Sequence, residues 1–143
     1  MHADRLNDLS GRVIGCAFTV LNTFGTGFLE KVYENALTHE LRAAGLTVTQ
    51  QHSVKVHYNV VVVGEHFADL LVENVLLVEL KTVKALDEAH RLQCTNYLKA
   101  TGLQLCLLLN FGRSRLEDQT RSQRPMNRAE PSACSACICP DPR

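Results

Sequence analysis

The stretch from Phe67 to Val83, FADLLVENVLLVELKTV, constrains the fold more than any other part of the chain. It consists of two runs rich in Val and Leu on either side of the polar pair Glu73-Asn74, a pattern typical of a β-hairpin. The same runs carry charged side chains where a buried strand would carry none. The hairpin is therefore expected in a sheet, and its charges need an explanation.

Three of those charged side chains fall on one face of the predicted hairpin. If the loop centres on Asn74, Asp69 lies directly opposite Glu79. Lys81 shares a strand face with Glu79, because the two are two residues apart. Two carboxylates and an ammonium group so placed can hold a divalent metal ion and activate a water beside it. On this pattern alone, a cross-strand ion pair on a solvated face is the simpler explanation.

Length and composition indicate one globular domain of ordinary size, with 143 residues of which 45% are apolar. The chain has 15 basic and 15 acidic residues, and this balance argues against a strongly basic nucleic-acid coat protein. It does not exclude a local basic groove. No apolar run is long enough for a transmembrane helix, and the first residues lack a signal-peptide pattern, so a cytoplasmic location is expected.

Helical spacing of apolar residues predicts two helices before the strands, at residues 7–24 and about 28–44. The second helix carries a continuous apolar stripe. Glu30 sits on the edge of that stripe, and Glu34 lies one step further out. A carboxylate at the position of Glu30 could reach a shallow site, although an acid in the first helical turn also favours the helix dipole.

Period-two spacing begins at Leu46, and helical spacing returns after the hairpin. The predicted elements are strands at 48–58, 60–72, 75–83 and 103–111 and a helix at 85–100. Gln93 and Tyr97 lie one turn apart on that helix and point the same way. The order α-α-β-β-β-α-β predicts an α/β fold, with a mixed sheet, helices on its faces and a last strand parallel to a neighbour.

The segment Gly27–Tyr33, GFLEKVY, matches a G-x-x-E-x-x-Y signature, and the chain resembles the GxxExxY protein family, a branch of the PD-(D/E)xK nuclease superfamily. The resemblance runs from about Leu9 to Gly112. It includes TGFLEKVYENAL, ADLLVENVLLVELK, QCTNYLKATG and LLLNFG in the same order. It implies the restriction-endonuclease-like α-β-β-β-α-β core with an extra N-terminal helix, in a nuclease-like domain over residues 1–112.

The resemblance also implies a role for each candidate residue. The implied catalytic residues are Asp69, Glu79, Lys81 and Gln93, the implied metal ligands are Glu30, Asp69 and Glu79, and the implied supporting residues are Tyr33 and Tyr97. Lys81 would position or polarise the attacking water and stabilise charge developing on phosphorus. The oxygen ligands suit Mg²⁺ or Mn²⁺ better than zinc.

The function implied is hydrolysis of phosphodiester bonds, in DNA rather than RNA. The expected partner is nucleic acid, with a second copy or a recognition partner to position it and no membrane. Thr19 and Leu21 depart from the family, whose members often carry Glu and His at these positions. This departure and the neutral net charge keep open a catalytically inactive module that binds nucleic acid or protein. A small structural protein that dimerises through an open sheet edge is a third interpretation.

The end of the chain also departs from the family. Residues 113–143 are rich in Arg, Ser, Pro and Cys, lack the alternation of a further strand, and are expected to be disordered. Cys134, Cys137 and Cys139 have a spacing that can chelate an ion. With three thiols and no neighbouring His, a dedicated zinc site is not expected, and a replaced or frameshifted terminus is an equally good explanation.

Overall fold

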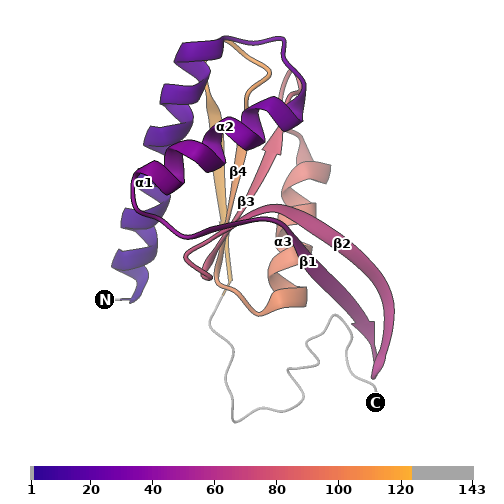
Figure 1. Cartoon of the computed structure of the whole chain (residues 1–143). Coiled ribbons are helices and arrows are strands. Elements are labelled where there is room, and N and C mark those ends of the chain that lie inside the picture. The colour runs from indigo at the N-terminus through magenta and orange to yellow at the C-terminus, as the bar shows by residue number, and fades with distance from the viewer. Residues whose placement is uncertain (1, 124–143) are drawn as a thin grey trace.

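In the computed structural model, which describes residues 2–123, five strands form one mixed sheet in the order β1-β2-β3-β4-β5 (Figure 1). The elements are α1 His2–Phe24, α2 Glu30–Ala43, β1 Val48–Tyr58, β2 Val61–Val72, β3 Leu76–Lys81, α3 Glu88–Thr101, β4 Leu105–Asn110 and β5 Glu117–Ser122. β3 and β4 are parallel, and the other neighbouring pairs are antiparallel. The predicted fold class and the parallel last crossover are confirmed.

The sheet lies between α1 and α2 on one face and α3 on the other (Figure 1). Successive strand residues point in opposite directions, and helices cover both faces of the sheet at β3, so its side chains are buried on both sides. Leu76 and Val78 pack with α1 and α2, whereas Leu77 packs with α3. Each fully buried leucine contributes roughly 2 kcal/mol. Among the described helices, none is long and apolar enough to cross a membrane.

The β1–β2 hairpin changes the face it presents partway along its length. Val48 and Leu70 belong to the core under α1 and α2, whereas Val54 and Ala68 belong to the core under α3. Leu70 and Ala68 are two positions apart in the sequence, so a regular strand would place both on one face. The switch occurs at Asp69 and the residue beside it on β1. Beyond it, the hairpin curves away from the rest of the sheet (Figure 1).

The structure extends the sheet beyond the predicted domain boundary at residue 112. β5 pairs with β4 in antiparallel register, from Leu105↔Ser122 to Asn110↔Glu117. The expectation of disorder is therefore wrong for this strand. It was missed because the half-buried side chains of β5 are polar and give no apolar alternation: Glu117, Gln119 and Arg121 bond to Asn110, Arg91 and Thr95. The cysteines at 134, 137 and 139 lie outside the described residues.

Candidate active site

Asp69 and Glu79 meet where β2 and β3 stop pairing. The register runs from Val72↔Leu76 to Leu70↔Val78, so the predicted centre at residue 74 is confirmed. One residue further, the backbone N–H of Asp69 donates to Glu79 Oε2 at 3.1 Å. The N–H of Leu80 donates to Asp69 Oδ2 at 2.8 Å. Carboxylates replace carbonyls as acceptors at this point, so the strands separate without leaving these N–H groups unpaired.

Both carboxylates hold a proton more readily than an exposed acid does. Glu79 is only 3% exposed, and burial, followed by the charge of Asp69, raises its pKa to about 9. Burial also raises the pKa of Asp69, partly offset by the N–H of Leu80. Taking a carboxylate out of water disfavours its charged form, and a second carboxylate nearby adds to the effect. The positive charge near the pair is therefore too small to offset the effects of burial and of their mutual repulsion.

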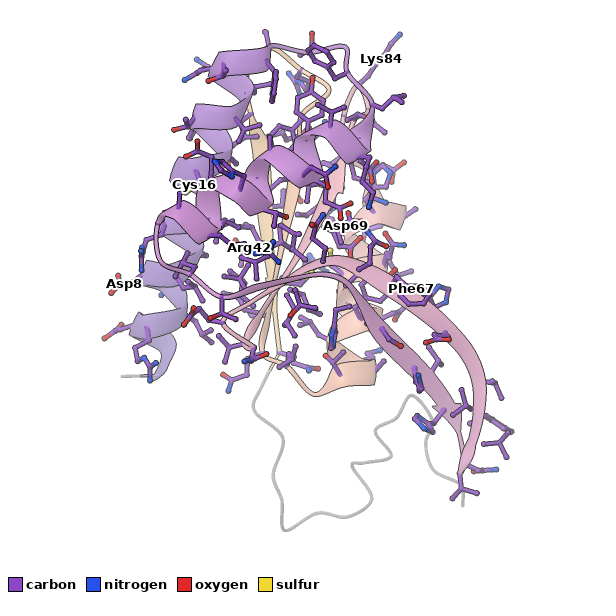
Figure 2. The ribbon with its side chains drawn as sticks, viewed as in Figure 1. Asp8, Cys16, Arg42, Phe67, Asp69 and Lys84 are labelled. Carbon is purple, nitrogen blue, oxygen red and sulfur yellow. The ribbon has the colours of Figure 1, made fainter. Side chains whose placement is uncertain are left out.

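Glu30 and Lys81 lie within electrostatic range of this pair. Glu30 is the first residue of α2, and its pKa is raised by burial and then by the charge of Asp69. Lys81 ends β3, and its ammonium group lowers the pKa of Glu30, Asp69 and Glu79 against these larger effects. Figure 2 shows Asp69 between α2 and the start of the curved part of the hairpin. Four residues from α2, β2 and β3 therefore share one electrostatic environment.

The chemistry of these donors fits a hard divalent cation. All the candidate ligands are carboxylate oxygens, the type that Mg²⁺ and Mn²⁺ prefer, and their mutual repulsion would be relieved by a cation. Within residues 2–123, no three His, Cys, Asp or Glu side chains are grouped so as to hold a metal ion by themselves. Mg²⁺ commonly takes one or two carboxylates and completes its shell with water and substrate phosphate. Asp69 and Glu79 would supply these two carboxylates.

Gln93 and Tyr97 line a cleft on the α3 side. Gln93 Nε2 donates to the Tyr97 hydroxyl oxygen at 3.3 Å. Burial, then the charges of Glu79 and Asp69, raises the pKa of Tyr97 to about 12, so its hydroxyl keeps its proton. The cleft has a volume of about 510 Å³ and is lined by Val56, His66, Ala89, Leu92, Gln93, Asn96 and Tyr97. Tyr97 therefore lies within electrostatic range of the carboxylate pair and lines the cleft together with Gln93.

The contacts of Tyr33 lie in the core and in the turn before α2. Its ring stacks on Phe111 with centroids 4.9 Å apart and is fully buried. Its hydroxyl donates to the carbonyl of Gly25 and accepts the N–H of Phe28. Tyr33 thus fixes the turn that leads into α2, the helix whose first residue is Glu30.

Thr19 and Leu21, at positions where members of the resembled family often carry Glu and His, add no charge to the site. The hydroxyl of Thr19 donates to the carbonyl of Gly15 within α1. Leu21 is buried in the core under α1 and α2. The predicted acidic residues of the site lie on α2, β2 and β3.

Glu34 is a site residue whose placement the sequence did not predict. It was expected further from the core than Glu30, yet it is only 2% exposed. Its carboxylate accepts hydrogen bonds from Lys31 at 3.1 Å, from Gln50 at 2.8 Å and from Gln51 at 3.1 Å. The helical stripe did not reveal this burial, because β1 covers that side of α2. The available signal was its position one turn after Glu30.

Asn110 holds the chain just beyond Lys81. It is fully buried, and its Oδ1 accepts the N–H of Val83 at 3.0 Å while its Nδ2 donates to the carbonyl of Val83 at 2.9 Å. The N–H of Phe111 donates to the carbonyl of Lys81 at 2.8 Å. A Cβ on Gly112 would lie 2.3 Å from the Val83 carbonyl oxygen. β4 therefore fixes the backbone on which Lys81 is carried.

A model of the PD-(D/E)XK nuclease superfamily matches residues 7–123, a range that includes β5. A search of curated proteins finds no match. One solved structure, described as "Crystal structure of SSO0001", is 14% identical with a TM-score of 0.49. The match covers 70% of this chain and 52% of that chain, so this protein spans about half the length of that one.

Proposed function

Because the chain belongs to the PD-(D/E)XK nuclease superfamily, we propose that it is a divalent-metal-dependent nuclease that hydrolyses phosphodiester bonds of DNA. The observation that carries the proposal is the Asp69–Glu79 pair at the end of the β2–β3 ladder, with Lys81 beside it. The G-x-x-E-x-x-Y segment and the hairpin motif support the GxxExxY branch as the closer assignment.

Asp69 and Glu79 would hold Mg²⁺ or Mn²⁺, with Glu30 at the rim of the site. The ion would supply positive charge to the phosphate oxygens and acidify a nearby water. The raised pKa values of the two acids support this assignment, since they record an environment in which added positive charge is favourable. Their backbone donors fix the direction in which each carboxylate points.

Lys81 would position or polarise the attacking water and stabilise the charge that develops at phosphorus. Its ammonium group is compact, carries three donors and lies within electrostatic range of both acids. A preorganised positive charge of this kind stabilises the transition state more than the ground state, because the phosphate gains charge during attack. Hydrogen bonds from Phe111 to the carbonyl of Lys81 and from Asn110 to the carbonyl of Val83 restrain the backbone position of Lys81.

The cleft beside Tyr97 is the proposed path for the substrate. None of its lining residues is acidic, and its amide, imidazole and phenol groups offer hydrogen-bond donors. Tyr97, with its raised pKa, stays a donor across the ordinary pH range. We propose DNA rather than RNA because of the resemblance to the superfamily. The cleavage experiment below includes RNA substrates to test this choice.

Calorimetric titration of Mn²⁺ into wild type and Asp69→Asn is the first experiment. Wild type should bind and the variant should not, after which cleavage is screened over DNA and RNA of single-stranded, duplex and branched form. Lys81→Met should bind Mn²⁺ but not cleave. Failure of folded wild type to bind the ion would remove the mechanism. Metal binding with no cleavage of any substrate would favour the inactive nucleic-acid-binding module instead.

A further inference from the structure

Gln51 has a backbone conformation that residues other than glycine rarely adopt. Its φ is +54°, in the left-handed region, within the long strand β1. Neighbouring strand residues normally point to opposite faces. Here both Gln50 and Gln51 reach the same carboxylate, that of Glu34 on α2. Such conformations cluster at functional sites because surrounding contacts must hold them in place.

The side-chain amide of Gln51 bridges two acids. Its Nε2 lies 3.1 and 3.2 Å from the two carboxylate oxygens of Glu34 and 3.3 Å from Asp69 Oδ1. An amide nitrogen carries two hydrogens, so it can serve one acid with each. Glu34 is buried and is also bonded by Lys31 and Gln50, which makes it a fixed anchor for this bridge.

Asp69 is consequently restrained at both oxygens. Gln51 donates to Oδ1 and the N–H of Leu80 donates to Oδ2. A carboxylate offers about four lone-pair positions, so two donors leave others open. Gln51 occupies part of the acceptor capacity of Asp69 and sets its direction without filling it.

We propose that Gln51 is the positioning residue of Asp69 and that Glu34 is its anchor. The role of this bridge toward a metal rests on the proposed function, whereas its control of the Asp69 carboxylate does not. Groups that orient a metal ligand typically change metal affinity by about 10- to 100-fold when removed. The same change in affinity is expected here.

Gln51→Gly is the decisive variant. Glycine adopts a positive φ freely, so the backbone keeps its shape while the amide is lost. Gln50→Ala is the matched control, because Gln50 donates to Glu34 and Asn35 but not to Asp69. Two readouts are taken: the Mn²⁺ dissociation constant by calorimetry, and, in metal-free protein, the hydrogen-exchange rate of the Leu80 amide that bonds to Asp69.

Gln51→Gly should weaken Mn²⁺ binding by about tenfold or more and accelerate exchange at Leu80. Gln50→Ala removes one bond to the Glu34 anchor but none to Asp69, so it should change both quantities much less. Unchanged Leu80 exchange in Gln51→Gly would overturn the positioning role. Equal effects of the two variants would also overturn it, since loss of Glu34 contacts would then explain both. If wild type binds no Mn²⁺, the proposed nuclease function fails, and Leu80 exchange alone still decides whether Gln51 positions Asp69.

Discussion

The backbone N–H of Asp69 donates to Glu79 Oε2 at 3.1 Å, one residue beyond the last paired position of β2 and β3. The strands can therefore part without exposing a buried, unpaired amide, and the two acids remain at the point of separation. This arrangement keeps carboxylates close together and partly out of water, at a cost that a cation would offset.

Replacing Asp69 by Asn should abolish Mn²⁺ binding and cleavage. The amide keeps the size of the side chain but removes the charge next to Glu79 and Glu30. The loss of affinity should exceed the roughly 100-fold effect of removing a group that only orients a ligand. Calorimetry measures the affinity, and circular dichroism checks the fold. Binding within a few-fold of wild type would exclude Asp69 as a ligand.

Replacing Lys81 by Met should reduce the cleavage rate by on the order of 10²- to 10³-fold, as for loss of one electrostatic stabiliser of a transition state. Metal affinity should hold or rise, because a positive charge near the acids is removed. Lys99→Met, at an exposed position in the last turn of α3, is the matched control. Single-turnover rates at saturating metal measure the cleavage step separately from metal affinity. A loss of metal binding in Lys81→Met would contradict the assigned role.

The free energy of unfolding of metal-free protein should fall as pH rises from about 5 to 9. The pKa of Glu79 is about 9 in the folded protein against an ordinary 4.5, so over this range the folded state keeps a proton that the unfolded state has lost. Stability falls wherever the folded state binds more protons, by up to about 1.4 kcal/mol per pH unit for one group. Urea titrations at several pH values in EDTA measure the slope, and Glu79→Gln should flatten it. An equally steep slope in that variant would assign the effect elsewhere.

Gly112→Ala should destabilise the fold by at least about 2 kcal/mol, in the range of overpacking in a rigid site. The added Cβ would lie 2.3 Å from the Val83 carbonyl oxygen and 2.5 Å from its nitrogen, and backbone atoms cannot move aside cheaply. Gly11→Ala is the control, since nothing lies within 4 Å there and alanine favours the helix by about 1 kcal/mol. Urea midpoints compare the two. Equal stability of both variants would refute the close approach of the segment after β4 to the segment after β3.

Leu92→Glu should weaken nucleic-acid binding without changing Mn²⁺ affinity. Leu92 is 51% exposed and lines the cleft beside Tyr97, so a negative charge there would repel phosphates by about 1 kcal/mol, roughly fivefold in affinity. Val62→Glu is the control, with 49% exposure on β2 at a position outside the cleft lining. Fluorescence anisotropy in Ca²⁺ measures binding. A larger effect at Val62 would place the substrate on the curved hairpin instead.

The sequence by itself determined the order of the elements from α1 to β4 and the opposition of Asp69 and Glu79. The hairpin loop turns through Glu73 and Asn74 with φ values of +54° and +60°, as a mirror-image turn between twisted strands requires. A local turn sets the register, and with side chains alternating along a strand, the register sets which charges meet. These relations span only a few residues, so spacing alone could reveal them.

Tertiary structure alone decided the burial of Glu34, the bridge made by Gln51 and the addition of β5 to the sheet. Glu34 is buried because β1 packs against α2, a contact between residues that are distant in sequence. β5 is stabilised by polar bonds to α3 and β4 rather than by its own apolar pattern. A solvent-facing helix and a covered one can share one sequence pattern, and only the packing of other elements distinguishes them. For that reason the polar contacts that orient the acids were found in the fold and not in the spacing.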